Sequence, residues 1–198
     1  MLIKIYEPTK YLRQYISEEG IGMNSFEIER LIDIYGKDIY RFCYKLSKNR
    51  YDADDLYQQT FLKALELANK IDENNNPRAY LFSLSVNIWK NEIRKYARHE
   101  RIAPTLPLTE INEEKIGTDP DMCKTVVDNE IYLAMNQIIN SLSEKYRIPI
   151  LLYYNGDLNI EDIAKICKCP KGTIKSRLFK ARELIKHELE VLGFEDYE

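Results

Sequence analysis

Basic side chains concentrate in one segment near the C-terminus, although the chain as a whole carries a formal net charge of −3. Between Lys165 and Lys186 there are eight lysine or arginine residues and a single acid, Glu183. Lysine can reach phosphates or guanine acceptors, serine can donate or accept a hydrogen bond, and a phenyl ring can lie against a thymine methyl group. These residue types occur on the polar faces of the segment, at Thr173, Lys175, Ser176, Phe179, Lys180 and Arg182. The local concentration of cations predicts contact with nucleic acid through one patch.

Two short helices joined by a turn would position these side chains. Asn159 can cap the first helix, and Asp162 favours its first turn. Its apolar face is predicted at Ile160, Ile163, Ala164 and Cys167. Pro170 interrupts the pattern because it lacks the amide that a helix interior needs. The second helix then buries Ile174, Leu178, Ala181 and Ile185. This arrangement predicts a helix-turn-helix whose second helix enters a major groove; the alternative is a solvated amphipathic hairpin.

The composition argues against an enzyme and against a membrane protein. No apolar run approaches the ~20 residues that span a bilayer, and no secretory signal pattern opens the chain, so we predict a cytoplasmic protein without membrane insertion. The two histidines, His99 and His187, lie far apart, and no phosphate-binding loop or nucleophile elbow is present. Cys167 and Cys169 alone form a poor zinc pattern, and Cys43 and Cys167 are better explained as core thiols. We predict no catalytic residue, no metal and no cofactor.

Long stretches show helical periodicity without β alternation, which predicts an all-α protein. Prolines and acids concentrate between two helical regions, as is typical of a flexible acidic linker. The predicted organisation is an N-terminal extension of unknown role at 1–23, a helical domain at 24–101, the linker at 102–126 and a helix-turn-helix domain at 127–198. Met23 is a second candidate for the true start of the chain.

Within the first domain, one helix is predicted to begin near Asp52 and another to run from about Arg78 to Arg101, with a loop between them at 72–77. The later helix carries a cationic stripe at Lys90, Arg94 and Arg98, with Asn87 and Asn91 beside it. Tyr80, Phe82 and Trp89 are interleaved with this stripe, and aromatic faces with cations often hold single strands. The alternative is that these aromatic residues belong to the core, as we expect for Phe82.

The helix near Asp52 contains a second informative segment, DADDLYQQTFLKA at 52–64. It groups Asp55, Gln58, Gln59 and Leu62 on one side, where hydrogen-bonding groups surround an apolar contact. From these residues alone, a patch that simply faces solvent is the favoured interpretation. In the second domain, Pro149 should either kink its helix or lie in the first turn of that helix.

The two informative segments together resemble the extracytoplasmic-function (ECF) sigma factors of bacterial RNA polymerase. That family has an N-terminal helical domain, region 2, with the approximate pattern D-A-E-D-L-x-Q-E-x-F-L-x-A. Its C-terminal helix-turn-helix domain, region 4, ends approximately in C-P-x-G-T-V-[KR]-S-R-[LI]-x-R-A-R, which CPKGTIKSRLFKAR at 169–182 matches. The resemblance covers residues 25–192. Gln59 stands where the family usually has an acid, and Pro149 is unusual for its helix.

The resemblance implies three groups of binding residues. Contacts with the minus-35 promoter element are implied for Pro170, Thr173, Lys175, Ser176, Phe179 and Lys180. Contacts with the melted minus-10 element, including capture of a flipped base by the asparagine loop, are implied for Asn74, Asn75, Asn76, Asn87, Lys90, Asn91 and Arg94. Contacts with core RNA polymerase are implied for Asp55, Gln58, Gln59 and Leu62.

The resemblance therefore implies a promoter-specificity subunit that binds core RNA polymerase and promoter DNA and assists promoter melting, with an anti-sigma factor as a possible further partner. Two alternatives come from other classes of protein. One is a stand-alone helix-turn-helix regulator whose N-terminal helices dimerise or sense a signal. The other is an interaction protein that sequesters a partner through those helices and binds no DNA. The segment at 52–64 favours the sigma factor, because a simple regulator does not need it. The promoter set and the inducing signal are not encoded in a readable form.

Overall fold

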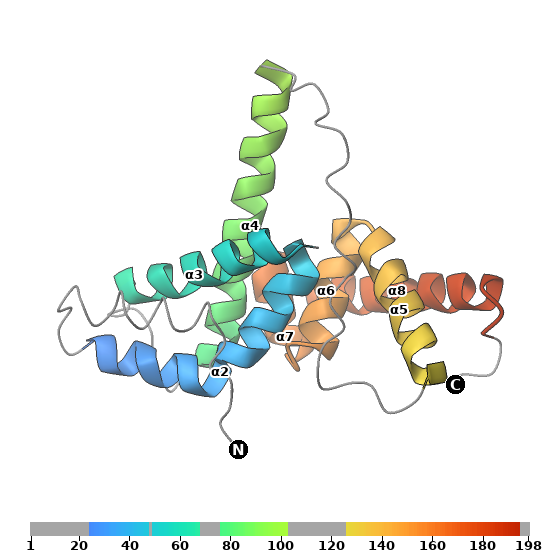
Figure 1. Ribbon diagram of the computed structural model, residues 1–198, viewed down its shortest axis with the longest axis horizontal. Coiled ribbons are helices and arrows are strands. Elements are labelled where there is room, and N and C mark those ends of the chain that lie inside the picture. The colour runs from blue at the N-terminus through green and yellow to red at the C-terminus, as the bar shows by residue number, and fades with distance from the viewer. Residues whose placement is uncertain (1–23, 48, 68–75, 103–125, 195–198) are drawn as a thin grey trace. The chain divides into compact units, whose positions relative to one another are not determined.

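The computed structural model describes residues 24–47, 49–67, 76–102 and 126–194. All of the regular structure in these ranges is α-helical, as the periodicity predicted (Figure 1). Contacts between Cα atoms divide the chain into two compact units, residues 1–111 and 112–198. The extension at 1–23 lies outside the described residues, and so does the predicted linker apart from its two end positions.

The N-terminal unit consists of α2 (Asn24–Ser47), α3 (Arg50–Glu66) and α4 (Pro77–Ile102), each of which packs on the other two. Helix α3 begins two residues before the predicted start at Asp52, because Asn49 is its cap. The Asn49 side chain accepts a hydrogen bond from the Asp52 backbone N–H at 2.9 Å and donates one to the Asp52 carboxylate at 2.7 Å. The first of these bonds satisfies a backbone donor that the helix itself leaves free.

Aromatic rings fill the space between the three helices of this unit. The Phe42 and Phe82 rings meet edge to face with 4.8 Å between their centroids, and the rings of Tyr57 and Phe61 lie 5.0 Å apart. Trp89, from α4, is only 7% exposed and belongs to the same core. The interpretation that Phe82 is a core residue is confirmed. The alternative of a core position also holds for Trp89, whose covered ring is not available for stacking on a nucleic acid.

A small polar cluster lies inside this core. The hydroxyl oxygens of Thr60 and Ser85 are 3.2 Å apart, and both residues are fully buried. Thr60 also lies within hydrogen-bonding distance of the Leu56 carbonyl, which keeps its hydroxyl satisfied. Burial raises the pKa of the neighbouring Cys43 thiol to about 12. Cys43 is therefore the inert core thiol that its apolar spacing predicted.

The C-terminal unit contains α5 (Val126–Ser141), α6 (Glu144–Tyr154), α7 (Ile160–Cys167) and α8 (Lys171–Val191). Helix α8 packs on each of the other three. The core of the unit is aliphatic and includes Ile148, Leu151, Leu152, Ile163, Ala164, Ile174, Leu178 and Ala181. Ile160, Cys167 and Ile185 are only half-buried, whereas Ile166, which the predicted apolar face of α7 did not include, is buried.

The turn from α7 to α8 follows from local backbone chemistry. Lys168 adopts a left-handed conformation with φ 52°, and the Cys169 N–H donates to the Ala164 carbonyl at 3.1 Å, which closes the end of α7. Pro170 is the N-cap of α8, where its missing amide hydrogen costs nothing. Its carbonyl accepts from the Thr173 N–H at 2.9 Å. This sharp turn confirms the predicted helix-turn-helix.

Pro149 lies in the middle of α6 and is buried, beyond the first turn of that helix. Of the two predicted alternatives, a position in the first turn is therefore excluded, and the other, a proline inside the helix, is what the structure has. Its ring takes part in the same apolar layer as its neighbours Ile148 and Ile150, which are also buried. Burial of this layer offsets the helical hydrogen bond that proline cannot donate.

A substitution at Gly156 should destabilise the C-terminal unit. A Cβ atom there would lie 2.6 Å from the Leu152 carbonyl oxygen, which also accepts from the Leu158 N–H at 3.2 Å. We expect Gly156→Ala to lower the free energy of unfolding by about 1–3 kcal/mol, because backbone must move. Circular dichroism should show the earlier transition, while fluorescence of Trp89, in the other unit, should be unchanged.

Gly172→Ala is the matched control for that measurement. A Cβ atom at Gly172, in the first turn of α8, would meet no atom within 4 Å. Alanine is also a better helix former than glycine, so this variant should unfold no earlier than the wild-type protein. Equal melting curves for the Gly156→Ala and Gly172→Ala variants would contradict the predicted clash.

Candidate nucleic-acid interface

The outer face of α8 presents the side chains that the sequence assigned to DNA. Lys175, Ser176 and Lys180 are exposed, and the Phe179 ring is 63% exposed although it is large and apolar. Thr173 is half-buried at the start of this face. An exposed phenyl ring between lysines on a helix that is buried on its other side has no packing role. The prediction that Phe179 points away from the core is confirmed.

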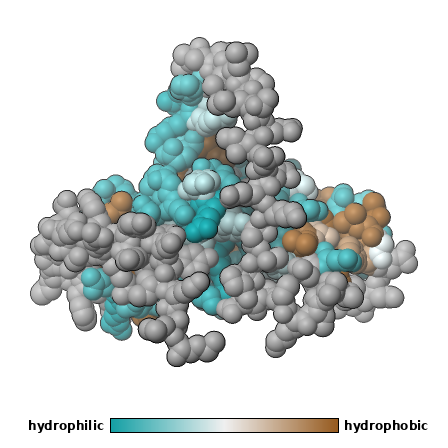
Figure 2. Space-filling view, viewed as in Figure 1, coloured by the Kyte–Doolittle hydropathy of each residue, from teal (hydrophilic) through white to brown (hydrophobic). Residues whose placement is uncertain are grey.

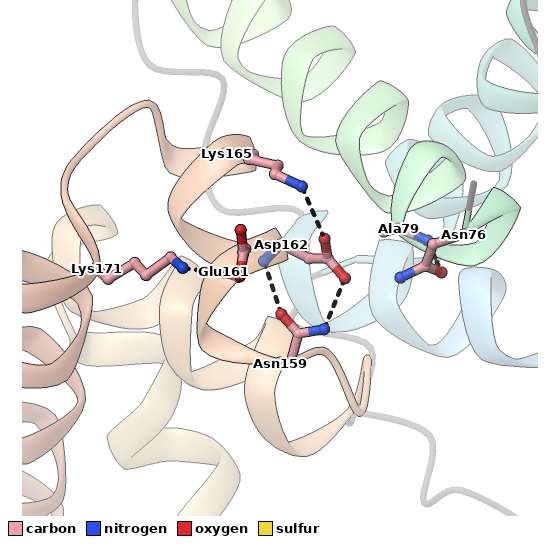
Figure 3. Close-up of polar contacts among 7 residues, drawn as sticks. All are labelled: Asn76, Ala79, Asn159, Glu161, Asp162, Lys165 and Lys171. Atoms are coloured by element: carbon pink, nitrogen blue, oxygen red, sulfur yellow. Dashed lines mark hydrogen bonds and ion pairs between the residues drawn. The ribbon is translucent and has the colours of Figure 1, made fainter.

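The two helices of the helix-turn-helix are tied together by polar contacts shown in Figure 3. The Lys171 ammonium donates to the Glu161 carboxylate at 2.7 Å, and this hydrogen bond lowers the pKa of Glu161. At the start of α7, the Asn159 side chain accepts from the Asp162 N–H at 2.9 Å and donates to the Asp162 carboxylate at 3.0 Å. The predicted cap at Asn159 is confirmed. Of these contacts, only the Lys171–Glu161 contact joins α7 to α8, whereas the Asn159 cap orders the first turn of α7.

The second half of α4 carries the cationic stripe. Residues 91–99 are all exposed, including Arg94 and Arg98, while Lys90 is half-buried. The face of α4 that is visible in Figure 2 is coloured mostly hydrophilic. Asn91 is exposed and its side-chain oxygen lies 3.4 Å from the Arg94 guanidinium, whereas Asn87 is half-buried. The cationic stripe is therefore open to solvent over residues 91–99.

The predicted patch on α3 is also ordered by its own hydrogen bond. The Gln59 amide donates to the Asp55 carboxylate at 2.6 Å. Asp55 is exposed, and Gln58, Gln59 and Leu62 are half-buried. Gln59 further lines a shallow groove together with Asn91, Arg94 and other residues of α4. The structure thus places the α3 patch and the cationic stripe next to each other, which spacing along the sequence does not reveal.

Asn76 has a structural role that the sequence analysis missed. Its side-chain oxygen accepts from the Ala79 N–H at 3.1 Å, at the start of α4, and its backbone is left-handed with φ 51° (Figure 3). The sequence signal was available, because asparagine is a preferred cap and Pro77 is favoured at the first helical position. Asn74 and Asn75 lie outside the described residues.

The described residues hold few of the features that a metal site or a membrane span requires. No group of three or more histidine, cysteine, aspartate or glutamate side chains is placed to hold a metal ion in those ranges. No described helix is both long and apolar enough to cross a membrane. His99 and His187 are exposed on α4 and α8 and belong to different units.

Comparison with protein families matches both units. Residues 31–99 match the model for sigma-70 region 2, and residues 132–185 match the model for sigma-70 region 4. The matched ranges contain α3 with most of α2 and α4 in one unit, and α6, α7 and most of α8 in the other. The two matched regions therefore lie one in each of the two compact units.

Two relatives align with most of this chain. The chain is 30% identical over 164 residues to the ECF RNA polymerase sigma factor SigW of Bacillus subtilis, an alignment that covers 80% of this chain and 87% of the relative. It is also 30% identical over 159 residues to the ECF sigma factor EcfG of Rhodopseudomonas palustris, covering 79% of this chain and 81% of the relative.

Two solved structures share the fold. The sigma factor RpoE of Bartonella quintana, solved with the anti-sigma factor NepR, superposes with a TM-score of 0.68 at 24% identity, over 83% of this chain and 98% of that chain. CnrH, solved with the cytosolic domain of CnrY, gives a TM-score of 0.60 at 16% identity, over 91% of this chain and 98% of that chain. With region 2, region 4 and a relative aligned along most of its length, this protein belongs to the ECF sigma factors of RNA polymerase, which are initiation factors and not enzymes.

Proposed function

We propose that this sigma factor recognises a promoter with two separate helices, using α8 for the minus-35 element and α4 for the minus-10 element. The observation that carries the proposal is the outer face of α8. There, Lys175, Ser176 and Lys180 surround the Phe179 ring, which is 63% exposed. Lysines supply phosphate contacts and hydrogen bonds to guanine, and the ring supplies apolar contact with a thymine methyl group. A helix buried on one side by Ile174 and Leu178 presents these groups at a fixed angle.

The surface of α4 supports a different kind of contact. Its exposed half combines cations with asparagine amides, which carry both donors and an acceptor for base edges. Because Phe82 and Trp89 are core residues, we assign recognition of the opened strand to Lys90, Asn91 and Arg94 rather than to stacking on those rings. Asn87 joins this group as a half-buried neighbour.

The patch on α3 is proposed as the contact with core RNA polymerase. Asp55 and Gln59 are already hydrogen-bonded to each other, and Leu62 lies half-buried beside them. A preordered polar pair around an apolar residue loses little conformational entropy when a partner covers it. An anti-sigma factor is a further proposed partner, and we place the protein in the cytoplasm with the polymerase that it serves.

The stand-alone regulator is not favoured, because region 2 and region 4 occur together in one chain. Run-off transcription with purified bacterial core RNA polymerase and genomic promoter fragments tests the proposal. We expect transcripts from a subset of fragments without any other specificity factor. If no fragment were transcribed while the chain still bound core RNA polymerase, promoter selection by this chain alone would be refuted.

Substitutions on α8 should separate affinity from sequence preference. Lys180→Ala should weaken promoter binding by holoenzyme about equally for all minus-35 sequences and reduce the slope of log affinity against log salt by about 0.9, because one counterion-displacing cation is lost. Phe179→Ala should instead change the preference among minus-35 sequences, by about 1–3 kcal/mol at the contacted position. Equilibrium binding to a panel of promoter duplexes measures both quantities.

Glu183→Ala offers the control, because Glu183 is exposed on the same helix but carries no donor for DNA. It should leave sequence preference unchanged and should not lower affinity. If Lys180→Ala and Phe179→Ala behaved like this control, α8 would not be the reading helix.

A further inference from the structure

An arginine and two tyrosines form a cluster where α6 meets α8. The Arg182 Nε donates to the Tyr154 hydroxyl at 2.9 Å. The guanidinium carbon also lies 5.7 Å from the centroid of the Tyr153 ring and 5.8 Å from that of Tyr154. The two rings meet edge to face, 5.0 Å apart. These contacts hold the guanidinium by one edge and against two aromatic faces.

The cluster is open to solvent although it is ordered. Arg182 is exposed, and Tyr154, the last residue of α6, is 60% exposed. Within the described part of the chain no carboxylate is paired with Arg182; its contacts there are the two tyrosines. Because Nε is the atom that Tyr154 engages, the two terminal nitrogens remain available as a fork of donors. A fork of this kind matches the oxygens of a phosphate.

Arg182 also lies in line with the side chains proposed to read DNA. Lys175, Phe179 and Arg182 occur at i, i+4 and i+7, so they follow one face of α8. The rise along the helix from Lys175 to Arg182 is about 10 Å. A major groove is about 12 Å wide. Because the rise from Lys175 to Arg182 is nearly the width of the groove, Arg182 falls at the phosphate backbone that borders the groove when Lys175 faces the bases.

We propose that Arg182, anchored by Tyr153 and Tyr154, binds a backbone phosphate next to the minus-35 element and fixes the register of α8 on the DNA. The inference rests on the proposed role of α8. Anchoring limits the rotamers that the arginine must give up on binding, so the contact is stronger than one from a free surface lysine. It carries no base information, and its effect should be the same for every minus-35 sequence.

The test compares promoter binding by holoenzyme across a range of salt concentrations. Arg182→Gln should lower affinity about tenfold and reduce the magnitude of the salt slope by about 0.9, as expected for one lost phosphate contact. Arg182→Met, which can still pack on both rings, should give the same slope. Arg182→Lys should restore the slope. Tyr154→Phe leaves the charge of Arg182 in place but removes the hydroxyl that accepts from its Nε. This variant should therefore keep the wild-type salt slope and lower the affinity for the promoter about threefold.

The control is Lys145→Gln, because Lys145 is an exposed cation at the opposite end of α6. Its salt slope should equal that of the wild-type protein. A purely structural role for Arg182 predicts the reverse pattern: Arg182→Gln and Arg182→Met would lower the melting temperature and leave the salt slope unchanged. That result would overturn the inference.

If Lys180→Ala reduced promoter binding while both neutral Arg182 variants did not, the phosphate contact would be refuted and the role of α8 would stand. If none of them reduced binding, the role of α8 itself would be refuted.

Discussion

Replacing Asp55 and Gln58 together by alanine is expected to weaken binding to core RNA polymerase by about 30- to 700-fold. Each polar group left unpaired in a desolvated interface costs about 1–3 kcal/mol, and the two positions are close enough that their effects will not add fully. A combined loss of about 2–4 kcal/mol corresponds to that range of affinity. Titration of labelled sigma factor with purified core enzyme measures it directly.

The structure provides a sharper version of this experiment. Asp55→Asn retains the shape of the side chain and its ability to accept the bond that Gln59 donates, but it removes the charge. If the polymerase contact depends on the charge of Asp55, the Asp55→Asn variant should lose most of the affinity for core enzyme that Asp55→Ala loses. If the contact depends on the hydrogen-bonded pair, the Asp55→Asn variant should retain most of that affinity. Asp33→Ala removes an exposed carboxylate from α2 and serves as the control. Wild-type affinity in the double variant would exclude the α3 patch as the contact.

The parts of the fold that were predictable from the sequence are those encoded by neighbouring residues. The turn between α7 and α8 follows from Asn159, Pro170 and an apolar spacing that a short window of sequence contains. The exposure of Phe179 could be inferred for the same reason, because Ile174 and Leu178 already define the buried side of a single helix. Periodicity is a local property, so it predicts which face of one helix is buried.

The features that the sequence did not predict depend on contacts between helices. Trp89 stands beside lysine and arginine in the sequence, and only the packing of α4 on the rest of the unit shows that its ring is buried. For Pro149 the sequence left open a kink inside the helix or a position in its first turn, and only the buried residues around it in the structure show that it lies in mid-helix. The Arg182–Tyr154 bond joins residues 28 positions apart and leaves no periodic signal. Such features require the tertiary structure.

The charge distribution of the chain bears on how the two proposed DNA-binding surfaces, on α8 and α4, would act together. The chain has a net charge of −3, so cations near α8 and along α4 act as local patches against an acidic background. A protein of this kind gains little from non-specific attraction to DNA. Under the proposed function, promoter selection would depend on engaging both patches at once, and attachment to core RNA polymerase would raise the effective concentration of the second patch once the first has bound.

The loop Asn74–Asn75–Asn76 should be required for opening duplex promoters, but its third residue must be replaced with care. Asn76 caps α4 through its side-chain oxygen and has a left-handed backbone. Aspartate keeps the acceptor and tolerates this conformation, whereas alanine does neither and would cost about 0.5–2 kcal/mol of stability. The informative variant is therefore Asn74→Ala, Asn75→Ala, Asn76→Asp. Permanganate reactivity of unpaired thymines should fall about tenfold or more on duplex promoters, because unstacking must be offset by contacts made only after melting.

The same variant should bind core RNA polymerase and the minus-35 element normally, since the surfaces of α3 and α8 are untouched. A promoter with a premelted bubble should recover part of the lost activity, because unpairing is already done, and recovery should stay incomplete where the captured base is read directly. Asn76→Asp alone, monitored by the fluorescence of Trp89, reports whether α4 keeps its cap. Normal thymine reactivity in the triple variant would remove the loop from the opening step. An absence of reactivity with wild-type protein and core RNA polymerase would instead contradict promoter opening by this sigma factor.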